Sequence, residues 1–94
     1  MFPHNESTDA LARAFLVLET ADDCYRLFED LFTIKEVQDL SQRLEVAKML
    51  SSGSTFTEIV KKTGVSTATI SRVNKALNYG TGGYKLVLGK IGKN

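Results

Sequence analysis

The length, composition and charge of this chain exclude several classes of protein. Its 94 residues are enough for one small domain, and a hydrophobic fraction of 43% is typical of a folded chain rather than a disordered one. The net charge is only +1, but residues 1–54 carry five basic and ten acidic side chains, whereas residues 55–94 carry seven basic and one acidic. This uneven distribution of charge has two interpretations. One is chance clustering. The other is an acidic N-terminal half that forms an assembly and a basic C-terminal half that faces the phosphates of a nucleic acid.

Cysteine and histidine usage indicates a reducing environment and no metal site. Cys24 is the one cysteine and cannot form an internal disulfide. With His4 as the one histidine, no zinc site is expected, and no catalytic set or phosphate-binding glycine loop is recognisable.

No apolar run approaches the ~20 residues that cross a bilayer, and residues 1–6 lack the segments of a secretory signal. We therefore expect a cytoplasmic protein that uses no cofactor, binds no membrane and is not an enzyme.

Helical periodicity recurs along the chain and predicts an all-α fold of about five to six helices. The first helix is predicted over about residues 8–18, and the second opens at residue 20 or 21. Each has an apolar stripe, formed by Leu11, Phe15 and Leu18 in the first and by Cys24, Leu27, Phe28, Leu31 and Phe32 in the second. The aromatic surface of these two helices is more than a chain of this size easily buries alone, which favours a dimer.

A third helix is predicted between residues 33 and 51. Thr33 and Glu36 have the spacing of a capping box at its start, and Gly53 suits the left-handed position after its end. Its expected buried side consists of Ile34, Val37, Leu40, Leu44, Ala47 and Leu50.

Residues 56–77 have the pattern of a helix-turn-helix. A second capping box, at Thr55 and Glu58, begins a short helix that continues to about Lys62. Gly64 supplies the positive φ that the turn needs, and Ser66 caps a further helix that continues to about residue 78. The residues expected to face inward are Ile59, Val60, Val65, Ile70, Val73 and Leu77. The tail, residues 79–94, is rich in glycine and has room for a short helix between residues 84 and 90.

The outward face of this motif is composed of small, hydroxyl-bearing and basic side chains, which suits a helix that enters the major groove of DNA. The candidate DNA-binding residues are Thr57, Lys61, Ser66, Thr67, Ala68, Ser71, Arg72 and Lys75. We expect Lys61, Lys62 and Lys75 to contact phosphate. Base edges would then meet Thr67, Ala68 and Ser71, partly through water because these side chains are short. The alternative is an ordinary pair of surface helices joined by a glycine turn.

Residues 31–78 resemble the tryptophan repressor superfamily. The matching positions are Leu31, Phe32, Thr33, Glu36, Gln42, Arg43, Leu44, Val46, Leu50, Gly53, Gly64, Leu77 and the run from Ala68 to Arg72. Residues 78–84 look more like the repressor-related YerC/YecD group than the tryptophan repressor itself. The resemblance implies one all-helical domain over residues 1–94 that pairs as an intertwined homodimer and binds double-stranded operator DNA. Residues 8–54 would form the dimerisation part, residues 55–78 the helix-turn-helix and residues 79–94 the tail.

The resemblance also implies a candidate effector pocket at Thr33, Arg43 and Arg72. Two arginines suit a carboxylate or a phosphate, but the tryptophan repressor has a glycine after the second arginine to admit the indole ring. Here that residue is Val73. Ala76 and Asp30 also depart from the family's pocket, in place of a hydroxyl and an apolar residue. An effector other than tryptophan is therefore expected, if one binds. The alternative makes Arg43 a surface ion-pair residue and Arg72 a phosphate contact.

A shorter part of the same segment resembles a second family. Residues 64–74 also resemble the lactose-repressor headpiece, but that motif begins a far longer chain, whereas here it follows fifty residues of predicted helix. The sequence therefore predicts a dimeric, sequence-specific transcriptional regulator, a repressor on the resemblance. The alternative is a protein-interaction module that keeps the helix-turn-helix shape without binding DNA.

Overall fold

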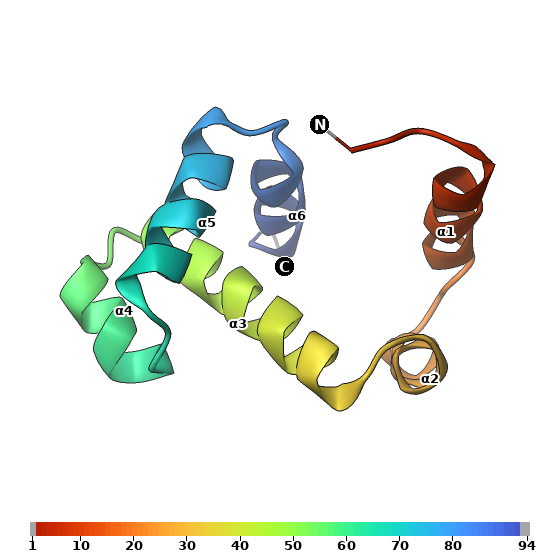
Figure 1. Ribbon diagram of the computed structural model, residues 1–94, viewed down its shortest axis with the longest axis horizontal. Coiled ribbons are helices and arrows are strands. Elements are labelled where there is room, and N and C mark those ends of the chain that lie inside the picture. The colour runs from red at the N-terminus through yellow and green to blue at the C-terminus, as the bar shows by residue number, and fades with distance from the viewer. Residues whose placement is uncertain (1, 93–94) are drawn as a thin grey trace. The chain divides into compact units, whose positions relative to one another are not determined.

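The computed structural model describes residues 2–92, and within this range all regular secondary structure is helical with no strand, as the periodicity predicts. The six helices are shown in Figure 1: α1 (Glu6–Leu16), α2 (Ala21–Leu31), α3 (Ile34–Ser51), α4 (Phe56–Thr63), α5 (Thr67–Tyr79) and α6 (Gly83–Ile91). The chain divides between Val37 and Gln38 into two compact units, an N-terminal unit and a C-terminal unit. The last two residues of the predicted tail lie outside the described range. No helix among the described residues is long and apolar enough to span a membrane.

Side-chain caps fix where the first four helices begin. Both predicted capping boxes are confirmed: the Thr33 amide donates to Glu36 Oε1 at 2.9 Å, and the Thr55 amide donates to Glu58 Oε1 at 2.8 Å. In each box the threonine hydroxyl accepts the glutamate amide in return. These reciprocal bonds satisfy amides that a helix start leaves without a partner.

Two further capping boxes were not predicted. Asn5 caps α1 with Thr8, so this helix begins two residues earlier than its predicted start. Thr20 caps α2 with Asp23. Because α1 ends at Leu16, Leu18 lies beyond the helix and does not extend its apolar stripe, contrary to the prediction.

The N-terminal unit has an aromatic cluster but no buried side chain in α1 or α2. The ring centroids of Phe15 and Phe32 are 6.5 Å apart, those of Phe28 and Phe32 are 5.9 Å apart, and Tyr25 meets Phe28 edge-on at 6.1 Å. Tyr25 is nevertheless 68% exposed and Leu16 is 81% exposed. This unit alone therefore leaves much of its apolar surface in water.

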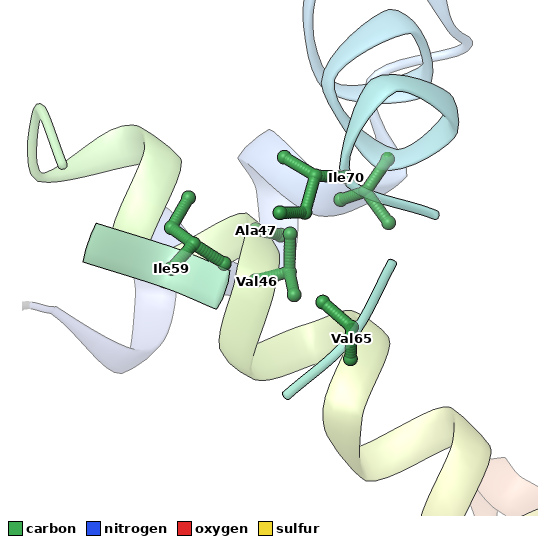
Figure 2. Close-up of a cluster of buried hydrophobic side chains, with 6 residues drawn as sticks. Val46, Ala47, Ile59, Val65 and Ile70 are labelled. Atoms are coloured by element: carbon green, nitrogen blue, oxygen red, sulfur yellow. The ribbon is translucent and has the colours of Figure 1, made fainter. Parts of the chain in front are cut away.

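The C-terminal unit holds the hydrophobic core. Its buried cluster comes from α3, α4, α5 and the turn between the last two, and consists of Val46, Ala47, Ile59, Val65, Ile70 and Val73. Figure 2 shows the labelled members of this cluster pointing toward one another. Leu77, which continues the same side of α5, is also buried. The core thus fixes both helices of the predicted DNA-binding motif against α3.

Helix α6 packs against this core. Gly82 precedes it in the left-handed conformation (φ 92°), and Tyr84 and Leu88 pack against the buried cluster. The predicted helix at residues 84–90 is confirmed and is slightly longer. The glycine-rich tail is therefore a structural part of the C-terminal unit as far as residue 92.

Three predictions about buried residues are wrong for the single chain. Val60 is 36% exposed, because its neighbour Ile59 takes the side of α4 that meets the core. Ile34 is 80% exposed and Leu40 is 43% exposed. The completely buried positions of α3 are confined to Val46 and Ala47, where the other core helices pack.

Candidate nucleic-acid interface

The turn between α4 and α5 is built from Gly64 and a bridging hydroxyl. Gly64 has φ 73° and its amide donates to the Val60 carbonyl at 2.9 Å, which ends α4. Thr63 Oγ1 donates to the Ile59 carbonyl at 2.7 Å and accepts the Val65 amide at 3.3 Å. The predicted role of Gly64 is confirmed. The role of Thr63 was missed, since a threonine at a helix end has no distinctive spacing pattern.

Helix α5 is capped at its start and anchored along one side. Ser66 Oγ accepts the Thr69 amide at 3.2 Å and lies 3.1 Å from the Thr69 hydroxyl. Ile70 and Val73 are buried at 0% and 2% exposure. Because the buried side is continuous, the residues on the opposite side of α5 are held in a fixed orientation toward solvent.

All eight candidate DNA-binding side chains are exposed, as required for contact with a nucleic acid. Thr67, Ser71 and Lys75 follow one another at four-residue spacing and so line one side of α5. On α4, Thr57 and Lys61 have the same spacing. Residues 38–94 carry nine basic and three acidic side chains, so this face belongs to the positively charged part of the chain.

The two adjacent lysines of α4 have different surroundings. Lys62 Nζ lies 3.3 Å from Glu45 Oε1 of α3. Across the described range, Lys61 has no ion-pair partner. The sequence predicted the same role for both lysines and missed this ion pair, because Glu45 and Lys62 are far apart in the chain.

The carboxylate of Glu58 is part of the capping box at the start of α4. The hydrogen bond from the Thr55 amide, helped by the Thr55 hydroxyl, holds the pKa of the Glu58 carboxyl below its ordinary value of 4.5. The charged form is favoured because it is the better acceptor for the amide at the start of α4.

A shallow pocket of about 250 Å³ lies between α3 and α5. It brings together two of the three predicted effector residues, Arg43 and Arg72. The complete lining is Asp39, Gln42, Arg43, Val65, Thr69 and Arg72. Neither arginine has an ion-pair partner within residues 2–92. Thr33 does not line this pocket; its hydroxyl accepts the Glu36 amide at the start of α3.

Comparison with known proteins gives concordant results. The profile of the family described as "Trp repressor protein" matches residues 6–91. The uncharacterised protein YerC of Bacillus subtilis is 51% identical over 83 residues, which are 88% of this chain and 80% of that protein. The crystal structure of a TrpR-like protein from Eubacterium eligens has 50% identity and a TM-score of 0.90, with 94% of this chain and 91% of that one covered. A Trp repressor candidate from Staphylococcus aureus has 43% identity and a TM-score of 0.91, covering 97% and 91% of the two chains.

Proposed function

We propose a DNA-binding regulatory function for this chain, which belongs to the Trp repressor family. The observation that carries the proposal is the exposed face of α5, which is small, hydroxyl-bearing and basic from Thr67 to Lys75 while the opposite face is buried. A helix inserted into the major groove needs small residues at its N-terminal end, so that it can approach the base edges closely, and it needs cations near the phosphates. The motif meets both requirements.

Base edges are assigned to the first two turns of α5. Thr67, Ala68 and Ser71 are exposed there and short. The two asparagines farther along α5 are engaged with each other, because Asn78 Nδ2 donates to Asn74 Oδ1 at 2.9 Å. The amide nitrogen of Asn78 thus donates within α5, and no base contact is proposed for either asparagine. Readout through bridging water follows as part of the proposal.

The phosphate contacts are assigned to Thr57, Lys61, Arg72 and Lys75, with Ser66 placing the start of α5 toward the backbone. Each lysine that neutralises a phosphate releases counterions, so affinity should fall steeply with salt. This electrostatic attraction brings the protein to DNA of any sequence. Contacts between base edges and the first two turns of α5 then select the operator.

The functional unit is proposed to be a homodimer. Its support is the uncovered apolar surface of the N-terminal unit, where α1 and α2 bury no side chain. A two-fold pair would present two copies of α5 to a palindromic operator with half-sites about one helical turn apart. The action is proposed to be repression.

The pocket between α3 and α5 is proposed as a site for a small anionic effector. Two guanidinium groups in one pocket suit a carboxylate or a phosphate. Because Arg72 belongs both to this pocket and to the DNA-facing helix, a bound anion would alter the charge that DNA meets. Tryptophan is not the expected ligand, since Val73 replaces the glycine of the tryptophan repressor and is 2% exposed within the core.

The first experiment is selection of bound fragments from genomic DNA, followed by titration of the enriched sequence against a scrambled one. We expect enrichment of a palindrome and at least about a thousandfold preference over the scrambled duplex. Ser71→Glu should abolish specific binding, because it places an acid at the centre of the DNA-facing side. The matched control, Ser7→Glu, adds the same charge to α1 and should bind normally. A failure to enrich any sequence at low salt, with metabolites added, would contradict the proposal.

The effector is tested by a thermal-shift screen of carboxylates, amino acids and phosphorylated metabolites. A ligand that binds only the folded protein raises its apparent stability. The shift should disappear in Arg43→Met and persist in Lys48→Met, which removes an exposed charge elsewhere on α3. A shift that survives Arg43→Met would place the ligand outside this pocket.

The competing function is a protein-interaction module that does not bind DNA. That function predicts a basic face that is covered by a partner protein or by the acidic half of the chain. Co-purification of a protein partner, together with DNA affinity that does not respond to Arg72→Ala, would favour it.

A further inference from the structure

The two neighbouring lysines of α4 lie on different sides of the helix. Ile59 marks the inward side, since it is completely buried in the core. Lys62 is three residues later and shares that side, whereas Lys61 is two residues later and points nearly the opposite way. Thr57 precedes Lys61 by four residues and so lies on the same side as Lys61. Helical geometry thus separates a lysine that faces solvent from one that faces α3.

The side of α4 that carries Lys62 meets an acid at a defined place on α3. Glu45 directly precedes Val46, a completely buried core residue, and its carboxylate lies 3.3 Å from Lys62 Nζ. The Glu45 side chain is 37% exposed and that of Lys62 is 66% exposed. Glu58, four residues before Lys62 on α4, is engaged by the Thr55 amide. Glu45 is therefore the acid that pairs with Lys62.

We infer that Glu45 is a positioning residue that keeps Lys62 from contacting phosphate and leaves Lys61 as the phosphate-binding lysine of α4. This inference rests on the proposed DNA-binding function and adds a division of labour within it. The carboxylate offers Lys62 a nearer anion than the duplex. An exposed ion pair is weak on its own, so removing the carboxylate frees Lys62 for DNA without unfolding the unit.

The measurement is the slope of the logarithm of the DNA-binding constant against the logarithm of the salt concentration, with full-length protein and one selected duplex. Each phosphate contact contributes about 0.9 to this slope. Lys61→Met and Lys62→Met keep the aliphatic stem and remove the charge, so they form a matched pair. Lys61→Met should reduce the slope by about 0.9 per bound chain, and Lys62→Met should leave it unchanged.

Removing the acid tests the role of Glu45 directly. Glu45→Gln should steepen the slope by about 0.9 per bound chain, which is about a 3.5-fold greater loss of affinity for each fourfold rise in salt. In the Lys62→Met background the same substitution should have no effect on the slope. The control Glu29→Gln removes an exposed acid of α2 and should change nothing.

Two results would overturn the inference. One is a reduced slope in Lys62→Met equal to that of Lys61→Met, because Lys62 would then contact phosphate despite Glu45. The other is an effect of Glu45→Gln that persists without Lys62, which would make Glu45 a general negative charge. If the wild-type protein binds no DNA at all, the proposed function fails instead, so the two failures are distinguishable.

Discussion

At the scale of single residues, the positive φ of Gly64 determines the angle at which α5 leaves α4. A side chain at this position would meet no atom within 4 Å, but φ 73° is unfavourable for any residue with a Cβ. We expect Gly64→Ala to lower the free energy of unfolding by about 1–2 kcal/mol, measured by urea denaturation.

Gly89 provides the matched control for Gly64. It lies within α6, also with open space around the Cβ position, and has an ordinary backbone conformation. Gly89→Ala should therefore stabilise the protein by about 0.5–1 kcal/mol. If both variants were destabilised equally, backbone strain would not be the reason for glycine at position 64.

The capping box of α4 should make the stability of the protein depend on pH. The folded-state pKa of Glu58 lies below its ordinary value of 4.5. Its contribution to stability is therefore complete above pH 4.5 and is lost as the pH falls through the lowered pKa. Unfolding followed by circular dichroism between pH 7 and pH 3 should show a shallower pH dependence for Glu58→Gln than for the wild type. Identical pH profiles would exclude this role for Glu58.

Single residues were predictable where a local signal matches a familiar pattern, and the boxes that end in Thr8 and Asp23 were missed because they lack the usual glutamate or glutamine. The boxes at Thr33 and Thr55 follow from spacings of three residues, and Gly64 follows from the demands of a tight turn. The Glu45–Lys62 pair depends instead on how two helices dock, and no short pattern encodes it. The same reason explains why the sequence treated Lys61 and Lys62 alike.

At the scale of helices, the packing of α4 depends on one residue. Ile59 is completely buried, whereas Val60 is 36% exposed. Ile59→Ala should cost about 2–5 kcal/mol through the lost contacts and the cavity left behind. Val60→Ala should change the free energy of unfolding by no more than about 0.5 kcal/mol. Similar losses for the two variants in denaturant titrations would show that Val60 is buried after all.

The existence and order of the helices were predictable from the sequence. The buried side of each helix was predictable only in part. On α5 the apolar residues fall on one narrow side, and Ile70, Val73 and Leu77 are buried as predicted. On α3 apolar residues recur along the whole helix, while complete burial is confined to Val46 and Ala47. Periodicity identifies an apolar side of a helix, but not which part of that side a partner covers.

At the scale of the whole molecule, the apolar surface of the N-terminal unit should control assembly. Leu16 is 81% exposed, so Leu16→Glu should leave the fold of a single chain intact. It should raise the dissociation constant of the proposed dimer about tenfold or more, because a charge would enter an apolar contact. Sedimentation across a dilution series measures this constant.

The control substitution should affect DNA binding instead of dimerisation. Thr57→Glu places the same charge on the DNA-facing side of α4, and it should weaken DNA binding while the dimer remains intact. A wild-type chain that sediments as a monomer at all concentrations would contradict the dimer, whatever the variants do. The uneven distribution of charge along the sequence favours the proposed division between assembly and DNA contact, but totals of charge do not identify the surface of the proposed dimer.

The division of the chain into two compact units has a genetic consequence. If pairing and DNA contact depend on different units, a chain with a defective α5 still associates with an intact one. The resulting mixed dimer would have one intact recognition helix, and it would lose most of its affinity for an operator with two half-sites. Mutations in α5 are therefore expected to be dominant over the wild-type allele, and mutations that abolish pairing are expected to be recessive.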